Sequence, residues 1–134
     1  MKKQNPLRNQ EGFTLVEIIA VLIILGILAA VAVPRYIDLE SSAKLRAVDA
    51  AVSELNGRES LTWADVKISS TGYPSSGGDT IVWTRLDKDL GADYTAWTPS
   101  ISGTSTFVFK GETFTVSRTP SDRGKPGVWR RVSP

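Results

Sequence analysis

The sequence contains no cysteine and no histidine. These two absences exclude disulfide bonds, thiolate and imidazole metal ligands, and the general base that enzymes use most often. An exported form of this protein would therefore have to be stable without covalent cross-links. We also find no nucleophile–base pair, no phosphate-binding loop and no metal-ligand cluster. The sequence predicts neither an enzyme nor a bound cofactor.

The net charge is also small, only +2 over 134 residues. All of this excess lies in the first 12 residues, where Lys2, Lys3 and Arg8 outweigh Glu11. The rest of the chain is neutral, and a nucleic-acid-binding domain usually carries a clear basic excess. No nucleic-acid partner is indicated.

Charge is almost missing from residues 13–33, FTLVEIIAVLIILGILAAVAV, where Glu17 is the only charged side chain. About 20 apolar residues are enough to cross a bilayer as a helix. Because the basic residues precede this run, the positive-inside rule predicts a cytoplasmic N-terminus and an exported remainder. A carboxylate costs about 2.5–3.5 kcal/mol at the centre of a membrane and less near an end, so such groups usually have a partner.

Residues 34–57 keep a helical pattern but become amphipathic. Asn56 and Gly57 form a plausible C-cap, so we expect one helix over residues 13–56. One face of its second half carries a stripe of residues spaced by threes and fours: Ile37, Ser41, Leu45, Val48, Val52 and Leu55.

Residues 58–134 have a different pattern, in which short runs of alternating apolar and polar residues are separated by loops rich in Ser, Gly and Pro. The expected elements are a short helix at 58–66, a strand at 80–86, a hairpin at 105–116 with its turn near Lys110-Gly111, and an edge strand at 128–132. The four tryptophans all lie in this region and are expected to form or cover its core: Trp63, Trp83, Trp97 and Trp129. The predicted fold class is α+β, with a long N-terminal helix packed against a small antiparallel sheet.

The start of the apolar run resembles a known family. Gly12 followed by FTLVE, which runs from Phe13 to Glu17, is similar to the processing site of type IV prepilins and the related pseudopilins. The motif combines a short basic leader, Gly, Phe, three residues, Glu and an unbroken apolar run. This resemblance covers roughly residues 8–40, and the motif is highly specific.

The resemblance implies roles for individual residues. A prepilin peptidase would cut after Gly12 and remove the leader, residues 1–12, and the same enzyme would N-methylate Phe13. Residues 13–33 would be the membrane anchor and later the filament core. Glu17 would neutralise the N-terminal amine, commonly of a neighbouring subunit. A free α-amine has a pKa near 8 and is largely cationic at neutral pH, so burial in a filament requires a carboxylate partner.

Gly26 and Pro34 occupy positions where the family has helix-weakening residues. Pro34 removes the hydrogen bond to the carbonyl of Ala30. The resemblance implies that residues 26–34 extend on assembly. The alternative is that both residues are simply tolerated, as glycine and proline often are in membrane helices.

The function implied is that of a type IV pilus subunit, a homo-oligomer in a helical filament serving adhesion, motility or DNA uptake. Its partners would be the membrane before assembly, the prepilin peptidase, an inner-membrane assembly platform and other minor pilins or pseudopilins. The precursor would be a single-pass inner-membrane protein and the product an extracellular pilus. The alternative is a pseudopilin of type II secretion, in a periplasmic pseudopilus.

Readings outside this family also exist. A membrane-anchored binding module would keep an uncut N-terminus and form no polymer. A secretory signal peptide is suggested by Ala30-Val31-Ala32, but its apolar region is usually shorter and rarely contains Glu. A plain single-span anchor explains the length of the run but not its motif.

The stretch DKDLGAD places Asp87, Asp89 and Asp93 close together. The spacing suggests weak calcium candidates, and the heads of some pseudopilins bind calcium. It departs from the EF-hand loop because Gly91 stands where another ligand belongs. The alternative is a solvated turn or short helix.

Overall fold

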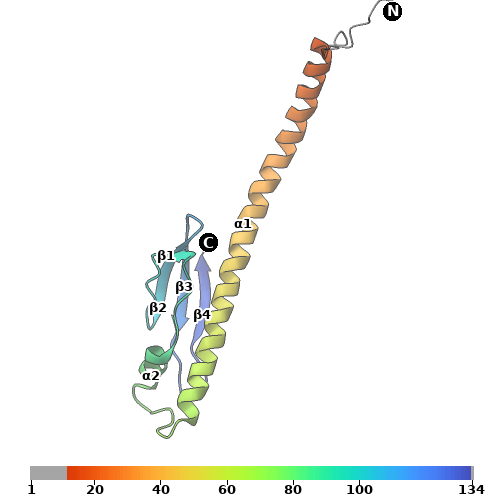
Figure 1. Ribbon diagram of the computed structural model, residues 1–134. Helices are drawn as coiled ribbons and strands as arrows, with labels where there is room; N and C mark the ends of the chain where they lie inside the picture. Colours follow the sequence, from red (N-terminus) through yellow and green to blue (C-terminus); the bar gives the residue numbers. More distant parts are fainter. Residues whose placement is uncertain (1–11, 134) are drawn as a thin grey trace, which may run out of the picture. The chain divides into compact units, whose positions relative to one another are not determined.

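The computed structural model describes residues 12–133, so most of the predicted leader, residues 1–11, lies outside the described part. The elements are two helices and four strands: α1 (Leu15–Ile68), α2 (Gly78–Arg85), β1 (Tyr94–Thr95), β2 (Gly103–Phe109), β3 (Glu112–Thr119) and β4 (Val128–Ser133) (Figure 1). This confirms the predicted α+β class. The chain divides into two compact units, and the boundary falls inside α1 between Glu40 and Ser41.

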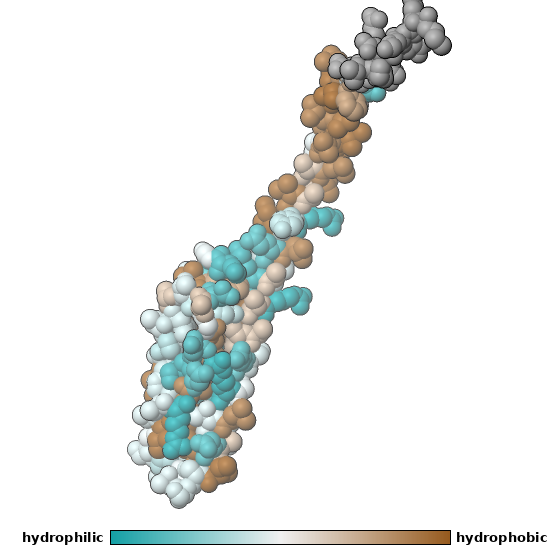
Figure 2. Space-filling view, in the orientation of Figure 1, coloured by the Kyte–Doolittle hydropathy of each residue, from teal (hydrophilic) through white to brown (hydrophobic). Residues whose placement is uncertain are grey.

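The first unit is an apolar helix without a core of its own. Its large hydrophobic side chains are between 46% exposed, at Ile18, and 81% exposed, at Phe13. Figure 2 shows this part of α1 as hydrophobic surface with few polar interruptions. By length and composition, α1 contains a stretch able to cross a membrane. Such a surface is stable only in a bilayer or against other apolar helices.

The second unit is built on an antiparallel sheet with the strand order β1-β2-β3-β4. A two-residue turn joins β2 to β3, and Lys110 and Gly111 both have positive φ, 50° and 80°. Positive φ at both central residues is the type I′ geometry that matches the twist of a hairpin. The predicted hairpin and the predicted edge strand are both confirmed.

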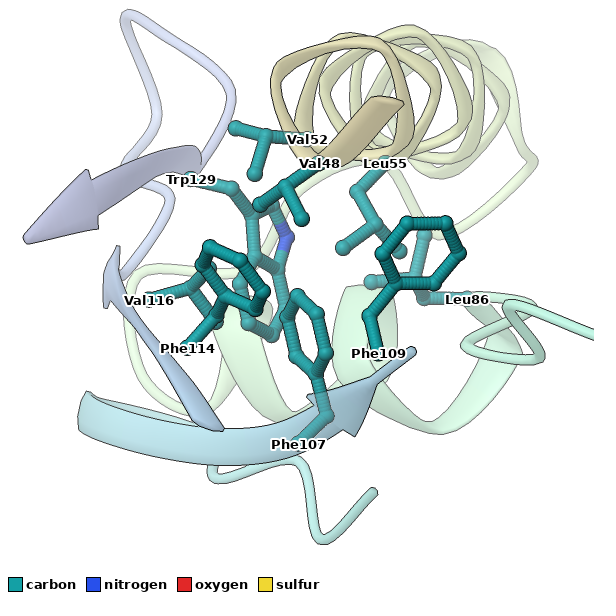
Figure 3. Packing of buried hydrophobic residues seen from close by; sticks show 9 residues of the cluster. All are labelled: Val48, Val52, Leu55, Leu86, Phe107, Phe109, Phe114, Val116 and Trp129. Atoms are coloured by element: carbon teal, nitrogen blue, oxygen red, sulfur yellow. The ribbon is translucent and has the colours of Figure 1, made fainter. Parts of the chain in front are cut away.

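The core of this unit lies between the sheet and α1. Val48, Val52 and Leu55 point from α1 toward the sheet, as Figure 3 shows. The other buried members are Leu86, Phe107, Phe109, Phe114, Val116 and Trp129. Trp83, Trp97 and Tyr94 pack against them, and Trp97 meets Phe107 edge-on at 5.6 Å. Aromatic side chains therefore form a large part of the core of this disulfide-free head.

The prediction that the first helix ends at Asn56 is wrong, because α1 continues to Ile68. The Asn56 side chain does not act as a cap. Its Nδ2 donates to the carbonyl of Trp129 at 2.9 Å, and its Oδ1 accepts the Trp129 N–H at 2.7 Å. Asn56 therefore pairs with the free edge of β4, and the expected short helix at 58–66 is the end of α1.

The predicted strand at residues 80–86 is also wrong, since these residues lie mainly in α2. TIVWTRL is rich in β-branched residues, which favour strands. However, Val82 and Leu86 are buried, at 0% and 3% exposure, whereas Thr84 between them is exposed. A strand would place all three on one face, but a helix places only Val82 and Leu86 together. Burial against the core overrides local propensity here.

A buried ion cluster joins remote segments of the head. The guanidinium of Arg118 in β3 donates to both carboxylate oxygens of Glu59 in α1, at 3.0 and 2.5 Å, and to both of Asp79 in α2, at 3.0 and 2.8 Å. It also donates to the carbonyl of Ile101. The side chains of Arg118 and Glu59 are fully buried. This ion cluster, defined as Arg118, Glu59 and Asp79, ties both helices to the sheet.

Two further contacts complete the ion cluster. Trp129 donates its indole N–H to Glu59 at 3.1 Å. Ser121 donates both its backbone N–H and its hydroxyl to Asp79, each at 2.7 Å. Burial alone would raise the pKa of Asp79, but the hydrogen bonds from Arg118 and Ser121 outweigh it and lower the pKa.

Candidate functional site

The N-terminal end of α1 is closed by a capping box. Thr14 precedes the first helical residue, and its hydroxyl accepts the backbone N–H of Glu17 at 3.3 Å. The Glu17 carboxylate accepts the backbone N–H of Thr14 at 2.7 Å and its hydroxyl at 2.8 Å. Two helix donors that would otherwise be unpaired are satisfied reciprocally.

This geometry extends the account of Glu17. Its carboxylate stabilises the positive end of the helix in the uncut chain, before any free amine exists at Phe13. Thr14 is the residue that sequence reasoning missed, although the pattern Thr-x-x-Glu in front of an apolar run is a recognisable capping signal. Cleavage after Gly12 would create an amine at Phe13, one residue before the Thr14 N–H that Glu17 already accepts.

Gly12 and Phe13 precede the helix. Neither residue is helical, and Phe13 is 81% exposed. Exposed chain outside regular structure is where proteases cut preferentially. Cleavage between these two residues remains a prediction.

Gly26 and Pro34 both lie within α1, and the helix runs through both positions. A side chain at Gly26 would meet nothing within 4 Å. Pro34 lacks the N–H of a normal helical residue, so the turn around it has one hydrogen bond fewer. Their proposed melting on assembly remains a prediction.

The three aspartates of DKDLGAD are not directed toward a common metal position. Asp87 lies 3.3 Å from Arg58, and Asp93 lies 3.9 Å from Lys110. Asp89 accepts the backbone N–H of Gly91 at 2.7 Å, which is a local turn contact. Within residues 12–133, no three carboxylate, imidazole or thiolate groups are positioned to hold a metal ion. The calcium hypothesis gains no support from this geometry.

Comparison with known proteins matches the motif and most of the chain. The model of the prokaryotic N-terminal methylation motif matches residues 7–33. The type IV narrow pilus major component PilA5 of Thermus thermophilus is 31% identical over 118 residues, which cover 81% of this chain and 87% of that protein. A fimbrial protein of Pseudomonas aeruginosa is 30% identical over 141 residues, with coverages of 92% and 85%.

A further relative belongs to a secretion system. The type II secretion system core protein G of Pseudomonas aeruginosa is 35% identical over 69 residues, covering 52% of this chain and 46% of that protein. No solved structure is significantly similar to the chain. The two pilins are matched over 87% and 85% of their own length, and the matches cover 81% and 92% of this chain. The chain therefore belongs to the type IV pilin family.

Proposed function

We propose that this protein is a structural subunit of a type IV pilus. After cleavage behind Gly12 and N-methylation of Phe13, the subunit polymerises through the apolar part of α1. The helices form the core of a helical filament, and the heads form its surface. Before assembly the precursor spans the inner membrane with its N-terminus in the cytoplasm, and the assembled pilus is extracellular.

One observation carries this proposal. The first unit exposes its apolar side chains on all sides, from Phe13 to Leu39. A bilayer covers these side chains in the precursor, and packing against the apolar helices of other subunits would cover them outside the membrane. The pilin relatives cover both the helix and most of the head, which supports the same conclusion.

Glu17 has a second role in this proposal. In the filament, the new amine at Phe13 is buried among apolar helices and needs a negative partner. Glu17 of a neighbouring subunit supplies it and thereby sets the docking register. The capping box keeps this carboxylate at the end of the helix until then.

The first experiment identifies the N-terminus. Cells are sheared, and the N-terminal peptide of this protein in the released fraction is analysed by mass spectrometry. We expect a peptide that begins at methylated Phe13 and is abundant in that fraction. A peptide that begins at Met1 or at Val33 would contradict the proposal, because it indicates an uncut chain or a signal-peptidase cut.

The second experiment tests Glu17. The variant Glu17→Ala should still be cleaved, but it should not enter filaments. Asp38→Ala is the matched control, since Asp38 is another carboxylate of the same unit and lies outside the motif. Normal piliation in the Glu17 variant would refute the pairing role.

The alternative is a pseudopilin of type II secretion. It is favoured by the match to core protein G, which is 35% identical but covers only 52% of this chain. A methylated Phe13 found only in the cell envelope would favour this alternative. In either system the expected partners are the prepilin peptidase, an assembly platform in the inner membrane and other pilins or pseudopilins.

A further inference from the structure

Asn56 and Gly57 form an Asn-Gly pair in the head. In such a pair the backbone nitrogen of the glycine can attack the side-chain amide carbon of the asparagine. Glycine favours this attack because it has no side chain to obstruct the approach and its backbone adopts the required conformation without strain. Residues 13–134 contain no other asparagine and no glutamine. Deamidation of a side chain in this part of the chain is therefore confined to Asn56.

Packing does not account for the glycine at position 57. Gly57 lies inside α1, where glycine is less favourable than alanine. A β-carbon at this position would meet nothing within 4 Å, and the backbone of Gly57 is helical. Neither the available space nor the backbone conformation requires glycine here. What glycine adds at this position is reactivity toward Asn56.

The folded head keeps the two reacting groups apart. The side-chain amide of Asn56 donates to the carbonyl of Trp129 at 2.9 Å and accepts the N–H of Trp129 at 2.7 Å, so it is fixed against β4. The N–H of Gly57 belongs to the hydrogen-bond ladder of α1. Ring closure between the two groups requires Asn56 to leave the helical conformation, which breaks both sets of hydrogen bonds. Water is not limiting, since Gly57 is exposed.

The reaction needs no enzyme and no oxidant. A bond forms between the nitrogen of Gly57 and the amide carbon of Asn56, and the bond from that carbon to Nδ2 breaks. Ammonia leaves and takes with it the proton of the Gly57 nitrogen. Water then opens the resulting succinimide at either of its carbonyl groups, which gives aspartate or isoaspartate.

Neither product can restore the contact with β4. Aspartate has no Nδ2 donor, and it places a carboxylate oxygen beside the Trp129 carbonyl that the native amide satisfies. Isoaspartate also adds a carbon to the backbone of α1, which interrupts the regular helix. A carbonyl without its donor and a repulsive oxygen next to it both destabilise the junction of α1 with β4.

We propose that Asn56-Gly57 is a self-modification site that the folded head keeps closed and that opening of the head activates. Conversion makes the opening permanent, because the modified chain has lost the side-chain bridge between α1 and β4. The chain has no cysteine, so no disulfide limits such opening. This inference goes beyond the proposed polymerisation and does not depend on it.

The test measures deamidation of the full-length chain in mild detergent, in an alkaline buffer made with heavy-oxygen water. After incubation the chain is digested with trypsin in ordinary water. Mass spectrometry then follows the peptide of residues 47–58, in which Asn56 is the only side-chain amide. Uptake of heavy oxygen marks conversion that took place during the incubation. We expect conversion to be faster by about tenfold or more in guanidinium chloride than in native buffer, because the reactive conformation is reached only when the head opens.

Two variants test the chemistry and its consequence. Gly57→Ala should convert more slowly than the native chain by about tenfold or more when both are unfolded, because the added methyl group obstructs the attack. Asn56→Asp reproduces one product and should lower the midpoint of urea unfolding by roughly 1 M. Gly57→Ala is its matched control and should not lower that midpoint, since alanine fits at this position and favours the helix.

The proposal is overturned if the folded chain converts as fast as the unfolded chain, because the head then does not close the site. It is also overturned if the unfolded native chain converts no faster than Gly57→Ala, or if Asn56→Asp is as stable as the native chain. All of these measurements use the monomer, so their outcomes are independent of filament formation. The sheared fraction reports on filament formation separately.

Discussion

Replacing Arg118 by methionine should destabilise the head severely. The side chains of Arg118 and Glu59 are both 0% exposed. Methionine removes both hydrogen bonds to Glu59 and leaves that carboxylate with the indole N–H of Trp129 as a donor. Breaking a buried pair in this way costs about 3–5 kcal/mol, because an uncompensated charge remains. Domains of this size are stable by only about 5–15 kcal/mol in total.

The assay is urea unfolding of the full chain in mild detergent, followed by tryptophan fluorescence. All four tryptophans lie in the second unit, so the signal reports on the head alone. For a slope of about 2 kcal/mol/M, the midpoint should fall by roughly 2 M. Arg130→Met is the matched control, since Arg130 is an exposed arginine of β4, and it should change stability by less than about 0.5 kcal/mol.

A double variant separates the charge from the packing. Arg118→Met combined with Glu59→Leu replaces the buried pair by apolar side chains and should recover most of the loss. Asp79 tolerates the change because its side chain is 19% exposed and keeps its bonds to Ser121. If Arg118→Met is no more destabilising than Arg130→Met, then the ion cluster does not hold the head together.

Two further predictions concern the edge of the sheet and acid stability. Asn56→Leu removes both hydrogen bonds to the backbone of Trp129 and should cost about 2–3 kcal/mol in urea unfolding, whereas the neighbouring exposed Ser53→Ala should cost under about 1 kcal/mol. Asp79 has a pKa below its ordinary value of about 3.9, so its stabilisation is complete above pH 5 and is lost as pH falls through the lowered pKa. The free energy of unfolding of Asp79→Asn should therefore depend less steeply on pH between pH 5 and 2 than that of the native chain. An unchanged slope would contradict the assigned role.

Local patterns were sufficient for the N-terminal third and for the hairpin. The apolar run is recognisable as a membrane helix because nearly all of its residues favour a hydrocarbon environment over water. The turn at Lys110-Gly111 is predictable because glycine adopts positive φ without strain. The motif from Gly12 to Glu17 identifies the family for a similar reason, since its information lies in adjacent residues. The pairing of Thr14 with Glu17 was also readable from their spacing of three.

Other features depended on contacts between remote segments. Residues 80–86 favour a strand locally but lie mainly in a helix, which buries Val82 and Leu86 while it leaves Thr84 exposed. Asn56 looks like a helix end, yet its partner is Trp129, 73 residues away.

The ion cluster shows most clearly what the sequence by itself could not determine. Arg118 is 59 residues from Glu59 and 39 from Asp79 along the chain. Charged residues have no periodicity that reveals a buried pair, and each of them would be assigned to the surface on its own. Their burial is favourable only when the three segments meet with the right geometry. The sequence by itself therefore determined the apolar helix, its processing motif and the family, and the tertiary structure decided how a head without disulfides is held together.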